Sequence, residues 1–171
     1  MNLKLAANEL GIGWQTLYSR LKQMGEPVTG DKLRYGSDRD KLGAMAEAEF
    51  KRIVPFASDN NGRKFQSKYD FEVAGWKVDV KASLPHQLNK RYAALSWSFS
   101  FKKQSLICDF ICCFCFSQDR VLDRILLVPR EFFRGLQTVS VSCFGDSKWL
   151  DYEIAADDLA PFFSELPPPK V

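Results

Sequence analysis

The first 25 residues repeat apolar positions with the spacing of two short helices. One apolar stripe comprises Leu3, Ala6, Ala7 and Leu10, and the second comprises Trp14, Leu17, Tyr18 and Leu21. Gly11-Ile12-Gly13 separates the two stripes, and Gly25 and Pro27 end the second helix. This pattern is typical of a helix-turn-helix, although an ordinary helical hairpin has the same pattern.

Polar and basic side chains alternate with the second apolar stripe. They are Gln15, Thr16, Ser19, Arg20, Lys22 and Gln23. Side chains of these types bind base edges and phosphates when a helix enters the major groove. Residues 1–25 therefore predict a DNA-binding helix-turn-helix, with the simple hairpin as the alternative.

Residues 26–38 are rich in Gly, Pro and charge, which predicts a linker. Lys32 and Arg34 could follow a phosphate backbone there, or be solvated linker charges. After the linker, apolar spacing from Leu42 to Ile53 predicts a helix over 40–54. Residues 39–171 are expected to form one further domain.

The domain of residues 39–171 is predicted to be rich in strands. Apolar runs predict strands over 69–73, 76–82, 95–101, 107–116 and 124–128. A helix is expected to begin near Pro129, because Pro is favoured in the first turn of a helix, and another to cover 157–165.

The stretch "YDFEVAGWKVDVKAS", residues 69–83, predicts a hairpin whose two-residue loop is Ala74-Gly75. Val73 would then pair with Trp76, Glu72 with Lys77, Phe71 with Val78, and Asp70 with Asp79. Because strand side chains alternate, one face carries Asp70, Glu72, Lys77, Asp79 and Lys81, and the other carries Phe71, Val73, Trp76, Val78 and Val80.

Two carboxylates opposed across a hairpin repel each other unless a cation lies between them. Carboxylate oxygens are ligands of Mg²⁺, and Lys81 beside them could position water or stabilise charge on a phosphate. This layout suits metal-assisted phosphodiester hydrolysis. The alternative is a hairpin whose charged face simply lies in water.

Taken in order, these residues resemble the PD-(D/E)XK nuclease superfamily, which includes many restriction enzymes and archaeal-type Holliday junction resolvases. Asp70 matches the first acid of the signature, "DVK" supplies Asp79 and Lys81, and Glu47 in "LGAMAEAEF" matches the helix Glu. The later segments "LSWSFSFKKQSLICDFICCFCF" and "RILLVPREFF" resemble the following core strands and helix. The resemblance covers about residues 39–135.

The resemblance implies an α/β fold: a restriction-endonuclease-like core with a central mixed β-sheet flanked by helices, beside the small N-terminal helix-turn-helix. It implies that Asp70, Asp79 and Glu47 bind Mg²⁺ or Mn²⁺ and that Lys81 orients the attacking water and stabilises the pentacovalent phosphate. Glu49 competes with Glu47, whose spacing from Gly43 is preferred. A basic flank would contact the DNA backbone: Lys77, Lys90, Arg91, Lys102 and Lys103.

Composition and charge indicate the kind of binding partner and the cellular compartment. Residues 61–104 hold nine Lys or Arg against three Asp or Glu, so a polyanion would meet this part of the chain first. No apolar run approaches the roughly 20 residues of a membrane helix, and the N-terminus lacks a signal-peptide pattern. Five cysteines without metal-like spacing favour a reducing compartment, so we expect a cytoplasmic protein, with a prokaryotic, phage or mobile-element setting plausible.

Several other residues are assigned to structure. Core packing is expected for Cys108, Cys112, Cys113 and Cys115, and for Trp97, Phe99 and Phe101. Asp109 is expected to cap a strand start or bind backbone, and a catalytic role is not favoured for His86 in a predicted loop.

The leading hypothesis is a Mg²⁺-dependent, sequence-directed DNA endonuclease of restriction or homing type, acting as a homodimer or higher homo-oligomer, since two strands need two active sites or two visits. The alternatives are a Holliday junction resolvase-like, structure-specific endonuclease and a non-enzymatic helix-turn-helix DNA-binding regulator.

Overall fold

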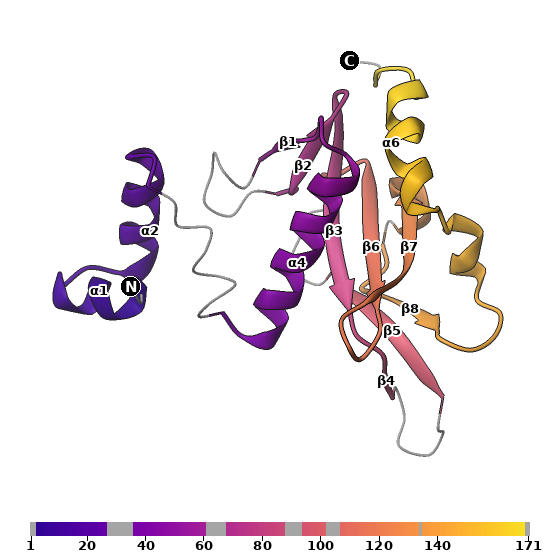
Figure 1. The fold of residues 1–171 in the computed structure, drawn as a ribbon, viewed down its shortest axis with the longest axis horizontal. Helices are drawn as coiled ribbons and strands as arrows, with labels where there is room; N and C mark the ends of the chain where they lie inside the picture. The colour runs from indigo at the N-terminus through magenta and orange to yellow at the C-terminus, as the bar shows by residue number, and fades with distance from the viewer. Residues whose placement is uncertain are drawn as a thin grey trace.

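Two β-sheets form the centre of the protein (Figure 1). The computed structural model describes residues 3–26, 36–60, 68–87, 94–101, 107–133 and 135–169, and the side chains of Lys4 and Lys22 lie outside that description. The larger sheet has five strands in the order β1-β2-β3-β6-β7, and the smaller has three in the order β4-β5-β8.

The strands are β1 (Ser58–Asp59), β2 (Phe71–Val73), β3 (Trp76–Ser83), β4 (His86–Gln87), β5 (Leu95–Ser100), β6 (Phe110–Phe116), β7 (Leu122–Pro129) and β8 (Thr138–Ser142). The helices are α1 (Leu3–Glu9), α2 (Trp14–Gln23), α4 (Asp38–Ile53), α5 (Arg130–Phe133), the 3₁₀ helix η1 (Lys148–Tyr152) and α6 (Ala156–Glu165). The expected α/β class, with a mixed central sheet flanked by helices, is confirmed.

The larger sheet is mixed because β3 and β6 run parallel while its other neighbours are antiparallel. Strand β6 is buried along its whole length, which explains its apolar sequence "FICCFCF". Its alternate side chains enter two different cores: Phe110, Cys112, Phe114 and Phe116 face one, and Ile111, Cys113 and Cys115 face the other. The prediction that these cysteines are buried is therefore confirmed.

Helices α4 and α6 cover one face of the larger sheet, and the smaller sheet covers the other. Phe50 of α4 and Phe163 of α6 are fully buried in the first core with Phe71 and Val78. The second core receives the alternating aromatic residues of β5 together with Val139, Val141, Phe133 and Trp149. The core positions predicted for Trp97, Phe99 and Phe101 are thus confirmed.

A capping box begins helix α4. The Ser37 hydroxyl accepts a hydrogen bond from the Asp40 backbone N–H at 3.2 Å, and the Asp40 carboxylate accepts one from the Ser37 backbone N–H at 3.1 Å. After the helix, the Lys51 ammonium donates to the carbonyl oxygens of Pro55 and Ala57, at 2.7 and 2.6 Å. These contacts satisfy carbonyl groups of the turn that leads from α4 to β1.

Helices α1 and α2 pack on each other, and Figure 1 shows them apart from the sheets. Ala7 and Leu17 are buried between them, and Gly11 has the positive φ (+63°) that the tight turn requires. Leu10, the last residue of the first apolar stripe, is 62% exposed. Helix α1 ends at Glu9, although the Leu10 backbone N–H still donates to the Ala6 carbonyl at 3.1 Å.

Three strands are absent from the sequence prediction: β1, β4 and β8. The first two have only two residues each, too few for a periodic signal. The five residues of β8 contain two apolar positions, Val139 and Val141. Within the described ranges, no helix combines the length and the apolar character needed to cross a membrane.

Candidate active site

The β2–β3 hairpin fixes the register of the candidate site. Val73 pairs with Trp76, Glu72 with Lys77, and Phe71 with Val78, so these three predicted pairs are confirmed. Ala74 and Gly75 both have positive φ, at +49° and +88°, as a type I′ turn requires. The printed pairs end at Phe71 and Val78, and the Asp70 backbone N–H also donates to the Val78 carbonyl, at 3.0 Å, so the pairing of Asp70 with Asp79 stays a prediction.

Asp79 lies inside the molecule, between the sheets. In the parallel neighbour β6, Ile111 aligns with Asp79 and Cys113 with Lys81, and both belong to the second core. Asp79 is only 1% exposed, and the side chain of Lys81 is 21% exposed. The alternative in which the charged hairpin face simply lies in water is therefore wrong at these two residues.

The Asp70 carboxylate is held by the backbone of the neighbouring strand. Its Oδ2 accepts a hydrogen bond of 2.7 Å from the Val80 backbone N–H, one residue beyond Asp79. The Asp70 carbonyl in turn accepts from the Asn60 backbone N–H at 2.8 Å. Asp70 is thus fixed at the end of the hairpin, close enough to Asp79 for the two carboxylates to interact.

Asp79 and Lys81 form a buried ion pair in which the Lys81 ammonium lies 2.6 Å from Asp79 Oδ2. Apart from this ammonium, no donor among the described residues is shown to bond to that buried oxygen. A carboxylate oxygen can accept more than one bond, so this atom is the first place to look for a ligand.

Burial raises the pKa of the Asp79 carboxyl to about 6. The Lys81 ammonium lowers this pKa, and the nearby Asp70 carboxylate raises it again. For Lys81, burial alone would lower the pKa, but the attraction of Asp79 outweighs burial and raises it. Near neutral pH the site therefore holds a carboxylate pair whose buried member is incompletely compensated by one cation.

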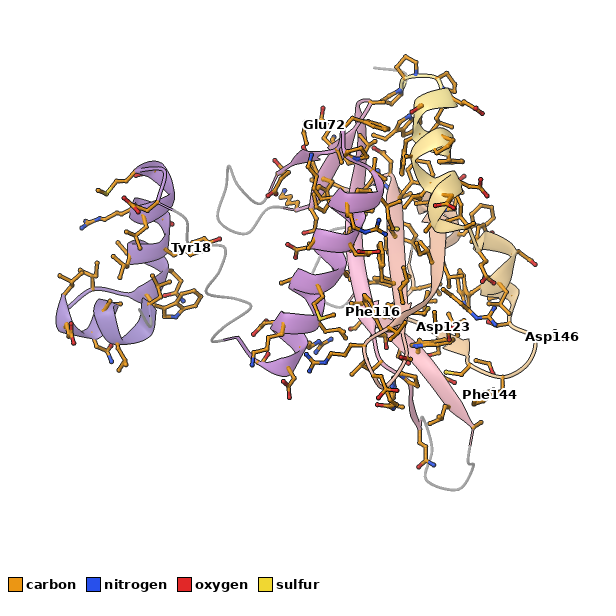
Figure 2. All side chains as sticks on the ribbon, viewed as in Figure 1. Tyr18, Glu72, Phe116, Asp123, Phe144 and Asp146 are labelled. Carbon is orange, nitrogen blue, oxygen red and sulfur yellow. The ribbon has the colours of Figure 1, made fainter. Side chains whose placement is uncertain are left out.

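Three other carboxylates lie on the neighbouring elements α4 and β2. Glu47 is half-buried on α4, directly after the core residue Ala46. Glu49 binds Arg52 through both oxygens, at 2.7 and 2.9 Å. Glu72, on β2, is exposed (Figure 2). Among the described residues no group of three His, Cys, Asp or Glu side chains is placed to hold a metal, so Glu47 as a third ligand stays a prediction.

The chemistry of the pair nevertheless fits a magnesium-like ion. Mg²⁺ in phosphate-processing sites is commonly bound by one or two carboxylates, with waters and substrate phosphate as its other ligands. Asp79 supplies a buried oxygen that contacts the Lys81 ammonium, and Asp70 supplies a carboxylate beside it. A divalent cation would supply the positive charge that this pair lacks.

The residues predicted to contact DNA are distributed over several parts of the chain. On α2, Gln15, Thr16 and Arg20 are exposed and Ser19 is half-buried, while only the backbone position of Lys22 is described. The half-buried Lys77 lies on β3, with its ammonium 5.9 Å from the centre of the Tyr69 ring. Six predicted contacts lie outside the described residues: Lys32, Arg34, Lys90, Arg91, Lys102 and Lys103.

Two polar residues complete the surroundings of the site. The Asp109 carboxylate accepts a hydrogen bond from the Lys77 backbone N–H at 2.9 Å, which confirms its predicted role at a strand start. Ser83, two residues after Lys81, is buried, and its hydroxyl accepts from the Ser98 backbone N–H at 3.0 Å. It ties β3 to the smaller sheet. His86 is exposed on β4.

Sequence reasoning gave no role to Tyr69. This side chain packs against the second core, immediately before Asp70. An aromatic residue directly before the first acid of the hairpin was the available signal.

No protein-family model matches the chain, and the search of curated proteins returns no similar sequence.

Proposed function

We propose that this protein is a Mg²⁺-dependent endodeoxyribonuclease of the PD-(D/E)XK type. The observation that carries the proposal is the buried Asp79, which lies beside Asp70 and 2.6 Å from the Lys81 ammonium. Two carboxylates and one lysine on one face of a hairpin form a small constellation suited to phosphodiester hydrolysis.

Each residue of the constellation has a distinct role in this proposal. Asp70 and Asp79 hold the metal, with Glu47 as an outer or second-metal ligand. When bound, Mg²⁺ supplies a Lewis acid that polarises the scissile phosphate. The Lys81 ammonium orients the attacking water and stabilises the negative charge that develops on the phosphate oxygens.

Sequence recognition is assigned to the N-terminal helix pair acting as a helix-turn-helix. The exposed Gln15, Thr16 and Arg20 on α2 are of the types that bind base edges and phosphates. A homodimer would place two such helices and two active sites on one duplex. This arrangement favours a restriction or homing type of enzyme.

The test of catalysis is a cleavage assay with Mg²⁺ and with EDTA on supercoiled DNA, random-sequence duplex and a synthetic four-way junction. Wild type is compared with Asp79→Ala, Lys81→Ala and the control Glu72→Gln, which alters an exposed carboxylate of the same hairpin. Metal-dependent cutting that is lost in the first two variants and kept in the control is expected.

The substrate that is cut separates the remaining alternatives. Preferential cutting of the junction would indicate a resolvase-like enzyme. DNA binding without cutting of any substrate, and without metal binding at the Asp70–Asp79 pair, would indicate a regulator and contradict the proposal. Changing Arg20 and Gln15 together to Ala should reduce site preference, and an unchanged preference would remove the reading role of α2.

A further inference from the structure

The candidate site contains a positive charge of its own. Lys81 follows Asp79 by two residues on β3, so the two side chains lie on the same face of the strand. The ammonium lies 2.6 Å from Asp79 Oδ2, and the Lys81 side chain is about four-fifths buried. The Asp70 carboxylate is held by the Val80 backbone N–H and interacts with both residues.

We propose that the Lys81 ammonium is the internal counter-cation of the Asp70–Asp79 pair: it stabilises the fold of the metal-free protein, and a divalent cation competes with it for Asp79. The inference deepens the proposed function, and it rests on that function only for the identity of the competing ion. It gives Lys81 a role before any substrate or metal is bound.

The counter-cation role follows from burial. Two neighbouring carboxylates repel each other, and a buried charge without a partner is expensive. Strand β3 is the central element of the site, with β2 on one side and β6 on the other. Loss of the ammonium would leave the Asp79 charge uncompensated in the second core, and the metal-free protein would lose stability.

The competition follows from the shared oxygen. Asp79 Oδ2 already has the ammonium at contact distance, and a metal bound to the same oxygen would face a like charge. Removal of the lysine charge should therefore tighten metal binding, whereas removal of the Asp79 charge should weaken it. If Lys81 acted only on substrate, removal of its charge would leave metal binding unchanged.

The first experiment measures thermal unfolding of the full chain in EDTA at pH 8. Lys81→Met keeps the apolar stem and removes the charge, and Lys77→Met is the matched control on the same strand face. We expect Lys81→Met to lower Tm by roughly 5 °C relative to Lys77→Met. In an Asp79→Asn background, the same substitution should lower Tm by much less, because the Asp79 charge that Lys81 compensates is absent.

The second experiment measures binding of Mn²⁺ without DNA, from the electron paramagnetic resonance signal of free Mn²⁺. We expect Lys81→Met to bind Mn²⁺ about tenfold more tightly than wild type, and Asp79→Asn to bind it at least tenfold more weakly. Saturating Mn²⁺ should also raise the Tm of Lys81→Met by more than that of wild type, because the metal replaces the missing charge.

The outcomes separate the inference from the proposed function. Equal Tm losses for Lys81→Met in the wild-type and Asp79→Asn backgrounds would overturn the counter-cation role. Unchanged or weaker Mn²⁺ binding in Lys81→Met, with binding still dependent on Asp79, would overturn the competition and leave the metal site intact. If neither wild type nor Lys81→Met binds Mn²⁺, the competition is wrong and the proposed function fails with it.

Discussion

The pH dependence of folding should report the buried carboxyl of Asp79. Its pKa is raised by burial to about 6, from an ordinary value of 3.8. The folded protein therefore binds a proton at this site more tightly than the unfolded chain does. Stability from this group is present at low pH and is lost as the pH rises from about 4 to about 6, which is opposite in direction to an ordinary surface ion pair.

The size of this effect follows from the two pKa values. The difference between about 6 and 3.8 corresponds to at most about 3 kcal/mol of unfolding free energy. Above about pH 6 the loss is complete. The Lys81 ammonium keeps its charge throughout this range because its pKa is raised, so its contribution does not change with pH.

The measurement is urea unfolding of wild type and Asp79→Asn in EDTA at several pH values between 4 and 7.5. Asparagine has the shape of the protonated carboxyl and does not titrate. The difference in unfolding free energy, wild type minus Asp79→Asn, should therefore fall by up to about 3 kcal/mol across this range. All groups that titrate in both proteins cancel in this difference.

Two results would refute the reasoning. A difference that stays constant with pH would mean that the carboxyl keeps an ordinary pKa in the folded protein. A difference that increases with pH would mean that attraction to Lys81 outweighs burial and lowers the pKa of Asp79 instead.

Three further substitutions test the fold around the site, each by urea unfolding at pH 7.5. Phe50→Ala empties a fully buried position of the first core and should cost about 3–5 kcal/mol. Gly75→Ala should cost about 1–2 kcal/mol, because φ is +88° and the new Cβ would lie 3.1 Å from Pro169 Cδ. Ser83→Ala leaves the half-buried Ser98 N–H without its acceptor and should cost about 1–3 kcal/mol, whereas a cost near zero would show that the two sheets need no such link there.

The hairpin register needed no tertiary information. A two-residue loop and the two-residue period of strand side chains determine which residues oppose each other, and both features are local. The same holds for β6, whose unbroken apolar run is typical of a strand buried on both faces. Strand pairing and the alternation within "YDFEVAGWKVDVKAS" therefore identified Asp70, Asp79 and Lys81 together.

The tertiary structure decided that Asp79 is buried. Its burial depends on β6, which begins 31 residues further along the chain, and on the smaller sheet, which includes β4 and β8. No local pattern distinguishes a charged strand face in water from one covered by a second sheet, because the covering strands come from distant parts of the chain. The sequence alone determined which charges stand together on the hairpin. Only the packing of the two sheets removes water from Asp79, and this burial makes a cation beside its charge favourable.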